Sequence, residues 1–166
     1  MSTLRRVTKF SGFFMSVGLL VALGCGQRPQ GSAAPAQLSE ASFTESGAYE
    51  LHFNAVRSDT LTPDIARAYG IDRSKNRVML NVTVLRKDGT PAVRKPVEAA
   101  VSVDARNLNG QLKPMELRRV NEGDAIYYIG ETGISGSEIL VFDIKATPAS
   151  ESTPIAAQLR REFFAD

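Results

Sequence analysis

Apolar and polar residues alternate with a period of two along most of the chain after residue 48. This period is typical of strands that bury one face, because successive side chains of a strand point to opposite faces. Turn residues such as Asp88-Gly89 and Asn109-Gly110 separate the alternating runs. The pattern predicts seven strands, over residues 49–55, 78–85, 97–105, 113–120, 125–129, 140–146 and 155–164.

One segment between the first two predicted strands breaks this alternation. Thr62 can cap the free N–H groups of a helix, Pro63 suits the first helical position, and Asp64 favours the positive end of the helix dipole. Gly70 can adopt the left-handed conformation that follows the last turn. We therefore expect one short helix near residues 62–70.

Seven short strands in about 120 residues predict an all-β fold, an immunoglobulin-like antiparallel β-sandwich. A small closed barrel is the alternative. Residues 124–128 (DAIYY) are similar to the start of the penultimate core strand of such sandwiches, where a Tyr hydroxyl bonds to the backbone. Because Ala125 and Ile129 flank Tyr127 on one face, we expect Tyr127 in the core and Tyr128 on the solvated face.

The N-terminus has the features of an export signal. Three basic residues precede an apolar run, residues 10–24, that is too short for a permanent membrane helix. Cys25 follows this run and resembles the lipidated cysteine of bacterial lipoproteins, although Ala22 replaces the preferred Leu. In such lipoproteins Gly26, in place of Asp, favours the outer membrane. Soluble export after Ala34-Pro35-Ala36 and an uncleaved anchor are the alternatives.

The sequence thus predicts three parts. Residues 1–24 are the lipoprotein signal peptide, residues 25–46 hold the acylated Cys25 and a flexible tether, and residues 47–166 form the β-sandwich. The tether is rich in Pro, Gly, Ser, Ala and Gln and has no apolar period. We expect the protein on the periplasmic side of a bacterial envelope, anchored in the outer membrane through the lipid on Cys25.

The stretch from Tyr49 to Phe164 resembles a family of small exported proteobacterial β-sandwich proteins that is catalogued as a domain of unknown function. The residues that carry the likeness are Leu61-Thr62-Pro63, Ala68-Tyr69-Gly70-Ile71, Arg73-Ser74-Lys75-Asn76-Arg77, Asn107-Leu108-Asn109-Gly110-Gln111-Leu112, Glu122-Gly123-Asp124-Ala125-Ile126-Tyr127-Tyr128-Ile129 and Phe163-Phe164. The resemblance implies the fold and the export, and it implies no activity.

Composition excludes several classes of function. With one Cys and one His, the chain has no internal disulfide, no multi-cysteine metal site and no His-rich zinc centre. Removal of the signal reduces the number of Lys and Arg residues from 20 to 17, against 18 acidic residues. The mature chain therefore has a net charge of about −1, which gives no support to a nucleic-acid partner. The sequence contains no nucleophile-elbow motif around a serine and no second histidine that could serve a catalytic triad. Its aspartates do not have the spacing of a calcium-binding loop. We expect no enzymatic activity, no metal and no cofactor.

The loop after the predicted helix is the strongest candidate for a binding surface. It holds three cations and one acid, and loops on rigid sandwiches often carry binding. The candidate binding residues are Tyr69, Asp72, Arg73, Lys75 and Arg77. The alternative is that these charges pair locally in a simple connection between helix and strand.

The sequence therefore predicts a non-enzymatic, membrane-tethered periplasmic protein that binds another envelope component. A second hypothesis is a metal- or small-ligand-binding module, in which His52 would have to converge with Met79 or Met115. A third is an enzyme built on carboxylates that folding brings together.

Overall fold

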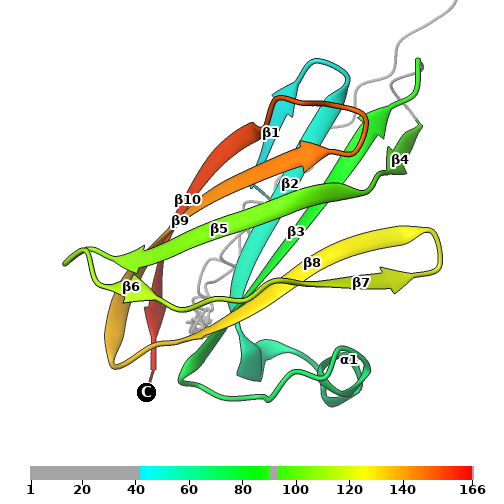
Figure 1. Cartoon of the computed structure of the whole chain (residues 1–166). Coiled ribbons are helices and arrows are strands. Elements are labelled where there is room, and N and C mark those ends of the chain that lie inside the picture. The colour runs from blue at the N-terminus through cyan, green and yellow to red at the C-terminus, as the bar shows by residue number, and fades with distance from the viewer. Residues whose placement is uncertain (1–41, 90–92, 166) are drawn as a thin grey trace, which may run out of the picture. The chain divides into compact units, whose positions relative to one another are not determined.

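The computed structural model describes residues 42–89 and 93–165, which form an antiparallel β-sandwich (Figure 1). Its elements in chain order are β1 (Ser42–Ser46), β2 (Tyr49–Arg57), η1 (Ser58–Thr60), α1 (Pro63–Ala68), β3 (Arg77–Lys87), β4 (Arg94–Pro96), β5 (Ala99–Asn107), β6 (Leu112–Lys113), β7 (Arg118–Glu122), β8 (Ala125–Gly133), β9 (Ser137–Pro148) and β10 (Ile155–Phe164). The predicted signal, Cys25 and most of the predicted tether lie outside the described residues.

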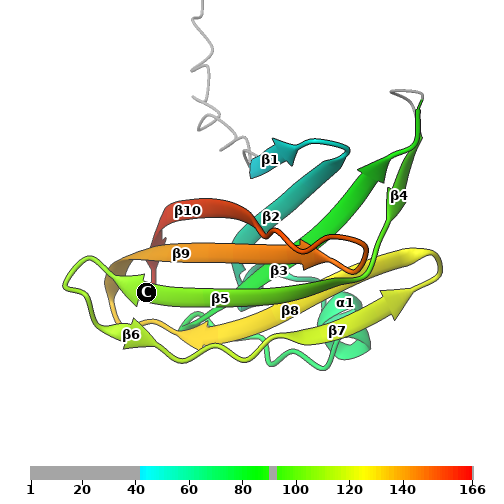
Figure 2. The same ribbon diagram turned by 45° about the horizontal axis from the view of Figure 1, so that its top comes forward.

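The strands form two separate sheets, seen as two layers in Figure 2. The first sheet has the order β1-β2-β3-β8-β7, and β4 pairs with the end of β3. The second sheet has the order β10-β9-β5-β6. The predicted antiparallel β-sandwich is confirmed, and these strands do not close into a barrel.

The main core lies between the two sheets, where alternate residues of the long strands meet. Leu51 of β2 and Leu80 of β3 are fully buried on the first sheet, and Phe142 and Ile144 of β9 face them from the second. Full burial of each such side chain contributes about 1.5–3 kcal/mol. The period of two in the sequence follows from this one-sided burial.

A smaller core covers the outer face of the first sheet. Ala66 of α1 and Ile71 pack there against Met79 of β3 and Ile129 of β8. The helix is confirmed, with the predicted cap: the Thr62 hydroxyl oxygen accepts the amide of Ile65 at 3.3 Å. Because this face is also covered, β8 is apolar on both of its sides.

The predicted orientation of Tyr127 and Tyr128 is wrong, because β8 is covered by this second core as well as by the main core. Tyr128 lies in the main core with 7% of its surface exposed, and its hydroxyl accepts the amide of Ala99 at 2.8 Å. Tyr127 is half-buried on the other face, against the smaller core. Tyr127 and its apolar neighbours on the same face of β8 lie under α1, and not between the two sheets. Since adjacent residues of a strand point to opposite faces, the prediction had the two tyrosines exchanged.

The structure also corrects the predicted strands in three places. Residues 42–46, predicted as tether, form β1 and pair with β2, so the sandwich begins five residues before the predicted start at Gly47. The short strand β4 was not predicted. The predicted strand 113–120 is two strands, because Lys113 pairs in the second sheet and Arg118 in the first. Pro114, which has no amide hydrogen, lies where the chain changes sheets.

Candidate functional site

The predicted binding loop, residues 71–77, leaves α1 in a fixed direction. Ile71 is 5% exposed within the smaller core, and its amide donates to the carbonyl oxygen of Ala66 at 2.8 Å. Gly70 before it has a φ of +58°, a conformation that favours glycine. The base of the loop is therefore held by packing and by a backbone hydrogen bond.

The side chain of Ser58 holds the middle of the loop from inside the domain. This η1 residue is fully buried. Its hydroxyl donates toward the carbonyl oxygens of Asp72 at 2.8 Å and Ser74 at 3.2 Å, and it accepts the amide of Ser74 at 2.9 Å. One buried hydroxyl thus orders the loop backbone without engaging any of the charged loop side chains.

The charged side chains of the loop remain on the surface. Asp72, Arg73, Lys75 and Arg77 are all exposed. The guanidinium of Arg73 donates to the carbonyl oxygen of Asp59 at 2.7 Å. A carbonyl has no net charge, so this contact orients Arg73 without neutralising it.

Local ion pairing accounts for only part of the charge around this loop. The carboxylate of Asp59 accepts two hydrogen bonds from Arg57, each of 3.0 Å. Arg77 lies 3.7 Å from the carboxylate of Glu131 on β8. The ordered loop therefore presents a surface on which cations outnumber free acids.

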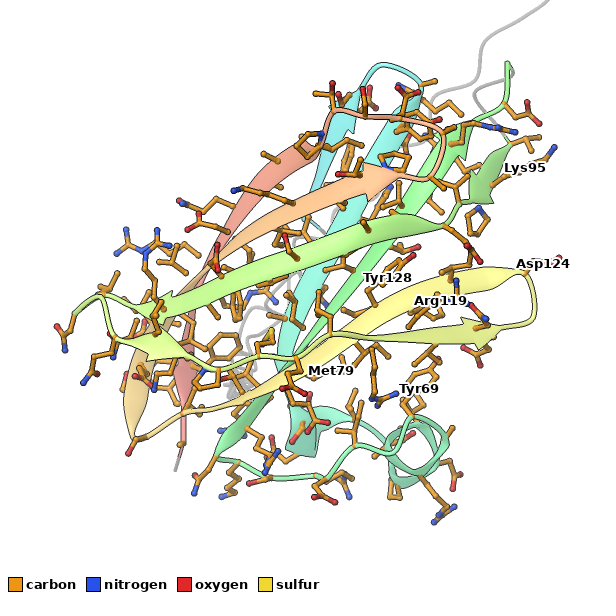
Figure 3. The ribbon with its side chains drawn as sticks, viewed as in Figure 1. Tyr69, Met79, Lys95, Arg119, Asp124 and Tyr128 are labelled. Atoms are coloured by element: carbon orange, nitrogen blue, oxygen red, sulfur yellow. The ribbon has the colours of Figure 1, made fainter. Side chains whose placement is uncertain are left out.

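Tyr69 does not belong to this surface, although the sequence places it beside the loop. Figure 3 shows it between α1 and β7, where its hydroxyl donates to the carboxylate of Glu122 and its carbonyl accepts a hydrogen bond from Arg118. The Glu122 carboxylate, aided by burial, raises the pKa of Tyr69 to about 12. Its ring also lies 6.5 Å from that of Tyr127. These contacts fasten α1 to β7.

The only histidine takes part in a different cluster, on the outer face of the first sheet. The imidazole of His52 lies 2.9 Å from the carboxylate of Glu50 and stacks on Phe43 of β1. Glu50 is 1% exposed and accepts hydrogen bonds of 2.7 and 2.9 Å from Arg94 of β4. The Arg94 guanidinium and then His52 lower the pKa of Glu50 to about 2.

Sequence reasoning identified His52 but not this cluster. The alternation places Glu50 on the same face as His52, which is a usable signal. Arg94 is 44 residues away, in the short strand β4 that the sequence does not reveal. The cluster therefore depends on a pairing that only the fold brings about.

The side chains required by the metal hypothesis do not come together. His52 lies opposite Thr83 of β3, whereas Met79 lies four residues further along that strand, about 13 Å away at the usual rise. Met115 packs against the main core, on the other side of the first sheet. Within residues 42–89 and 93–165, no three His, Cys, Asp or Glu side chains are grouped as metal ligands.

The surface hollows of the described domain are shallow. One of about 300 Å³ lies between residues 114–118 and β8, and one of about 440 Å³ lies over the outer face of the second sheet beside Asp104 and Asp143. Neither is lined by a residue of the loop 71–77. Among the described helices, none is long and apolar enough to cross a membrane.

The fold and the surface define a small antiparallel β-sandwich that carries an ordered, charged loop. Comparison with known proteins assigns the chain to a family within this class of fold. A model of the family described as "Domain of unknown function (DUF4426)" matches residues 43–166, and the chain belongs to this family. The family predicted from the sequence resemblance is thereby confirmed.

Solved structures of similar proteins agree with the fold. A DUF4426 family protein from Pseudomonas aeruginosa PAO1 is 35% identical, with a TM-score of 0.62 over 75% of this chain and 95% of that one. A copper-bound variant of FetP from uropathogenic Escherichia coli strain F11 is 13% identical, with a TM-score of 0.53 over 74% of this chain and 94% of its own, a likeness of fold alone. A search of the curated proteins gave no match.

Proposed function

We propose that this DUF4426 protein is a non-enzymatic, lipid-anchored sandwich of the periplasm that binds another envelope component through the loop 71–77. The observation that carries the proposal is the contact of buried Ser58 with the loop backbone. A loop ordered in this way loses little conformational entropy on binding, which favours affinity. The exposed Asp72, Arg73, Lys75 and Arg77 supply the charge that a partner would recognise.

The chemistry of the loop favours an acidic surface on the partner. Lys75 and Arg73 are exposed basic side chains, and Arg77 is only loosely paired with Glu131 at 3.7 Å. Opposite charges across an interface steer association and select the partner. We therefore expect the bound component to present carboxylates or phosphates to this loop.

The binding proposal can be tested by crosslinking in the native bacterial envelope, followed by recovery of the full chain. We expect the double variant Arg73→Glu with Lys75→Glu to reduce the crosslinked partner about tenfold, in line with hot-spot losses above 1 kcal/mol. The matched control reverses two exposed cations elsewhere, Arg86 and Arg160. If both double variants lose the crosslinked partner equally, or if neither loses it, the loop is not the binding surface.

The anchoring proposal rests on the sequence before residue 42 and needs its own test. We expect the wild-type chain to incorporate radiolabelled palmitate and to sediment with the outer membrane. Cys25→Ser should abolish both, because the acyl chains supply the membrane affinity, about 0.8 kcal/mol per buried CH₂. Palmitate that still enters the Cys25→Ser variant would refute lipidation at this residue.

A further inference from the structure

Strand β5 has one edge that lacks a partner strand along most of its length. On one side it pairs with β9 from Ala99 to Asn107. On the other side only Ala105 and Arg106 pair, with β6. In Figure 2, β6 accompanies β5 only at its end before the chain continues to β7. No strand in the described part of the chain pairs with this side of residues 99–104.

The direction of the backbone groups follows from two hydrogen bonds. The amide of Ala99 donates to the Tyr128 hydroxyl at 2.8 Å, and the amide of Asn107 donates to a carbonyl oxygen of the β5–β6 turn at 3.1 Å, both away from β9. Along an antiparallel strand, the N–H and C=O groups of alternate residues point to the same side. Val101 and Val103 therefore direct their backbone groups toward the open edge.

The edge is open because the chain leaves the second sheet early. Lys113 still pairs with Ala105 of β5, and the pairing between the two strands ends there. The following residues cross to the first sheet, where Met115 lies against Gly130 of β8. Arg118 then begins β7. Within the described part of the chain, residues 114–118 donate and accept no backbone hydrogen bond that would replace the missing ones of β5.

The edge strands β7 and β10 carry features that oppose strand addition. Natural sheets protect their edges with charged residues, short strands or covering segments. β7 is only five residues long, with charged residues at 118, 119 and 122, and β10 carries charged residues at 160–162 and lies beside β1. Residues 99–104, with the sequence AAVSVD, contain no Lys, Arg, Pro or Gly. This edge is therefore suited to pairing.

The outer face beside the open edge carries the exposed Asp104, and the exposed Lys145 lies on the same face opposite Ser102. Asp104 lies directly opposite Asp143 of β9, and like charges in that position destabilise a sheet. Asp143 is bound by Arg106 and by Gln158, the latter at 2.6 Å. Asp104 is exposed, and its side chain has no hydrogen-bond or ion-pair partner among residues 42–89 and 93–165. A cation on an added strand would lie beside it.

We propose that the open edge of β5 binds an extended segment of another polypeptide by β-strand addition. The backbone groups of Val101 and Val103 supply the hydrogen bonds, and their half-buried side chains contact apolar residues of the segment. A Lys or Arg of the segment pairs with Asp104. A second copy of this chain fits less well, since antiparallel pairing of β5 with itself about Ser102 places an alanine opposite Asp104. The site is separate from the loop 71–77 and does not depend on it.

Amide hydrogen exchange of the full-length chain, measured by NMR in detergent, tests the geometry first. The amides of Val101 and Val103 should exchange at least about tenfold faster than those of Ser102 and Asp104, which point toward β9. Equal protection of all four amides would show that the edge is already paired and would overturn the proposal.

Binding is then tested with two synthetic seven-residue peptides that alternate valine with threonine and carry a central lysine or a central glutamate. We expect chemical-shift changes centred on residues 99–104 and protection of the Val101 and Val103 amides. The lysine peptide should bind about two- to fivefold more tightly, and Asp104→Lys should reverse this preference. Shifts that centre elsewhere, or self-association through β5 without peptide binding, would overturn the proposal.

A backbone variant separates strand addition from side-chain contact. Val101→Pro removes an amide that the domain itself does not use, and proline is tolerated on an edge strand with this orientation. It should weaken the lysine peptide at least about fivefold, whereas Val101→Thr, which keeps the amide, should stay within about twofold. Continued protection of the Ser102 amide verifies that β9 is still paired. Equal peptide affinity of both variants would refute strand addition.

Discussion

Tyr128 is the side chain whose removal should damage the domain most within β8. Its ring lies in the main core with 7% exposed, and its hydroxyl accepts the amide of Ala99 at the start of β5 (Figure 3). Tyr128→Ala removes a buried aromatic ring, which costs about 3–5 kcal/mol. Tyr128→Phe keeps the ring and loses one hydrogen bond, which costs about 0.5–1.5 kcal/mol net. Total stabilities of about 5–15 kcal/mol leave the alanine variant close to unfolding.

Urea unfolding monitored by circular dichroism measures both effects. With a slope of about 1–3 kcal/mol per molar, the alanine variant should lower the midpoint by more than about 1 M. Tyr127→Ala is the matched control, because Tyr127 has the same side chain on the half-buried face of the same strand. We expect it to cost about half as much as Tyr128→Ala. A larger loss for Tyr127 than for Tyr128 would refute this account of the two faces.

Three further variants test other parts of the structure. Arg94 holds the pKa of Glu50 at about 2, below its ordinary 4.5, so the ionised carboxylate contributes stability that is present above about pH 5 and is lost as the pH falls toward 2. Arg94→Gln should therefore move the acid-unfolding midpoint to higher pH, and an unchanged midpoint would contradict it. Gly130→Ala places a Cβ 2.7 Å from a side-chain carbon and should cost about 1–3 kcal/mol in urea unfolding, whereas Gly133→Ala, with 3.9 Å of room, should stay within about 0.5 kcal/mol. Ser58→Ala should cost about 1–3 kcal/mol and speed amide exchange in the loop 71–77; unchanged exchange would show that the hydroxyl does not order it.

The parts of the fold that depend on local sequence could be predicted. Alternation indicated the long strands because each buries one face, as in Val78 to Val84 of β3. Thr62 and Pro63 placed the start of α1 because capping depends on residues within one turn. These signals need no knowledge of what the strands pack against.

The face that a strand buries could not be predicted where both faces are apolar. Tyr127 and Tyr128 differ only in whether α1 or the second sheet covers them, and that choice is made by elements far away in the chain. The same holds for β1, whose polar sequence is stabilised by pairing with β2 and by the stacking of Phe43 on His52. Tertiary context overrides local pattern in these cases.

The candidate loop was visible in the sequence, but the reason for its rigidity was not. Arg73 and Lys75 stand out as a cluster of charge after a helix. Ser58, which orders the loop, lies 14 and 16 residues before the groups it contacts and has no distinctive sequence context. A buried hydroxyl becomes recognisable only when its partners are known, because serine is common in exposed turns as well.

The weak alternation of residues 113–120 in the sequence is related to the open edge of β5, and the structure explains why. Residues 113–120 show a weak alternation because they do not form one strand: Lys113 belongs to the second sheet and Arg118 to the first. The residues before and after Pro114 therefore belong to different sheets. A segment that changes sheets ends its pairing with the first neighbour, so the weak pattern and the unpaired stretch of β5 have the same cause. Strand addition at residues 99–104 would complete the ladder that this crossing interrupts.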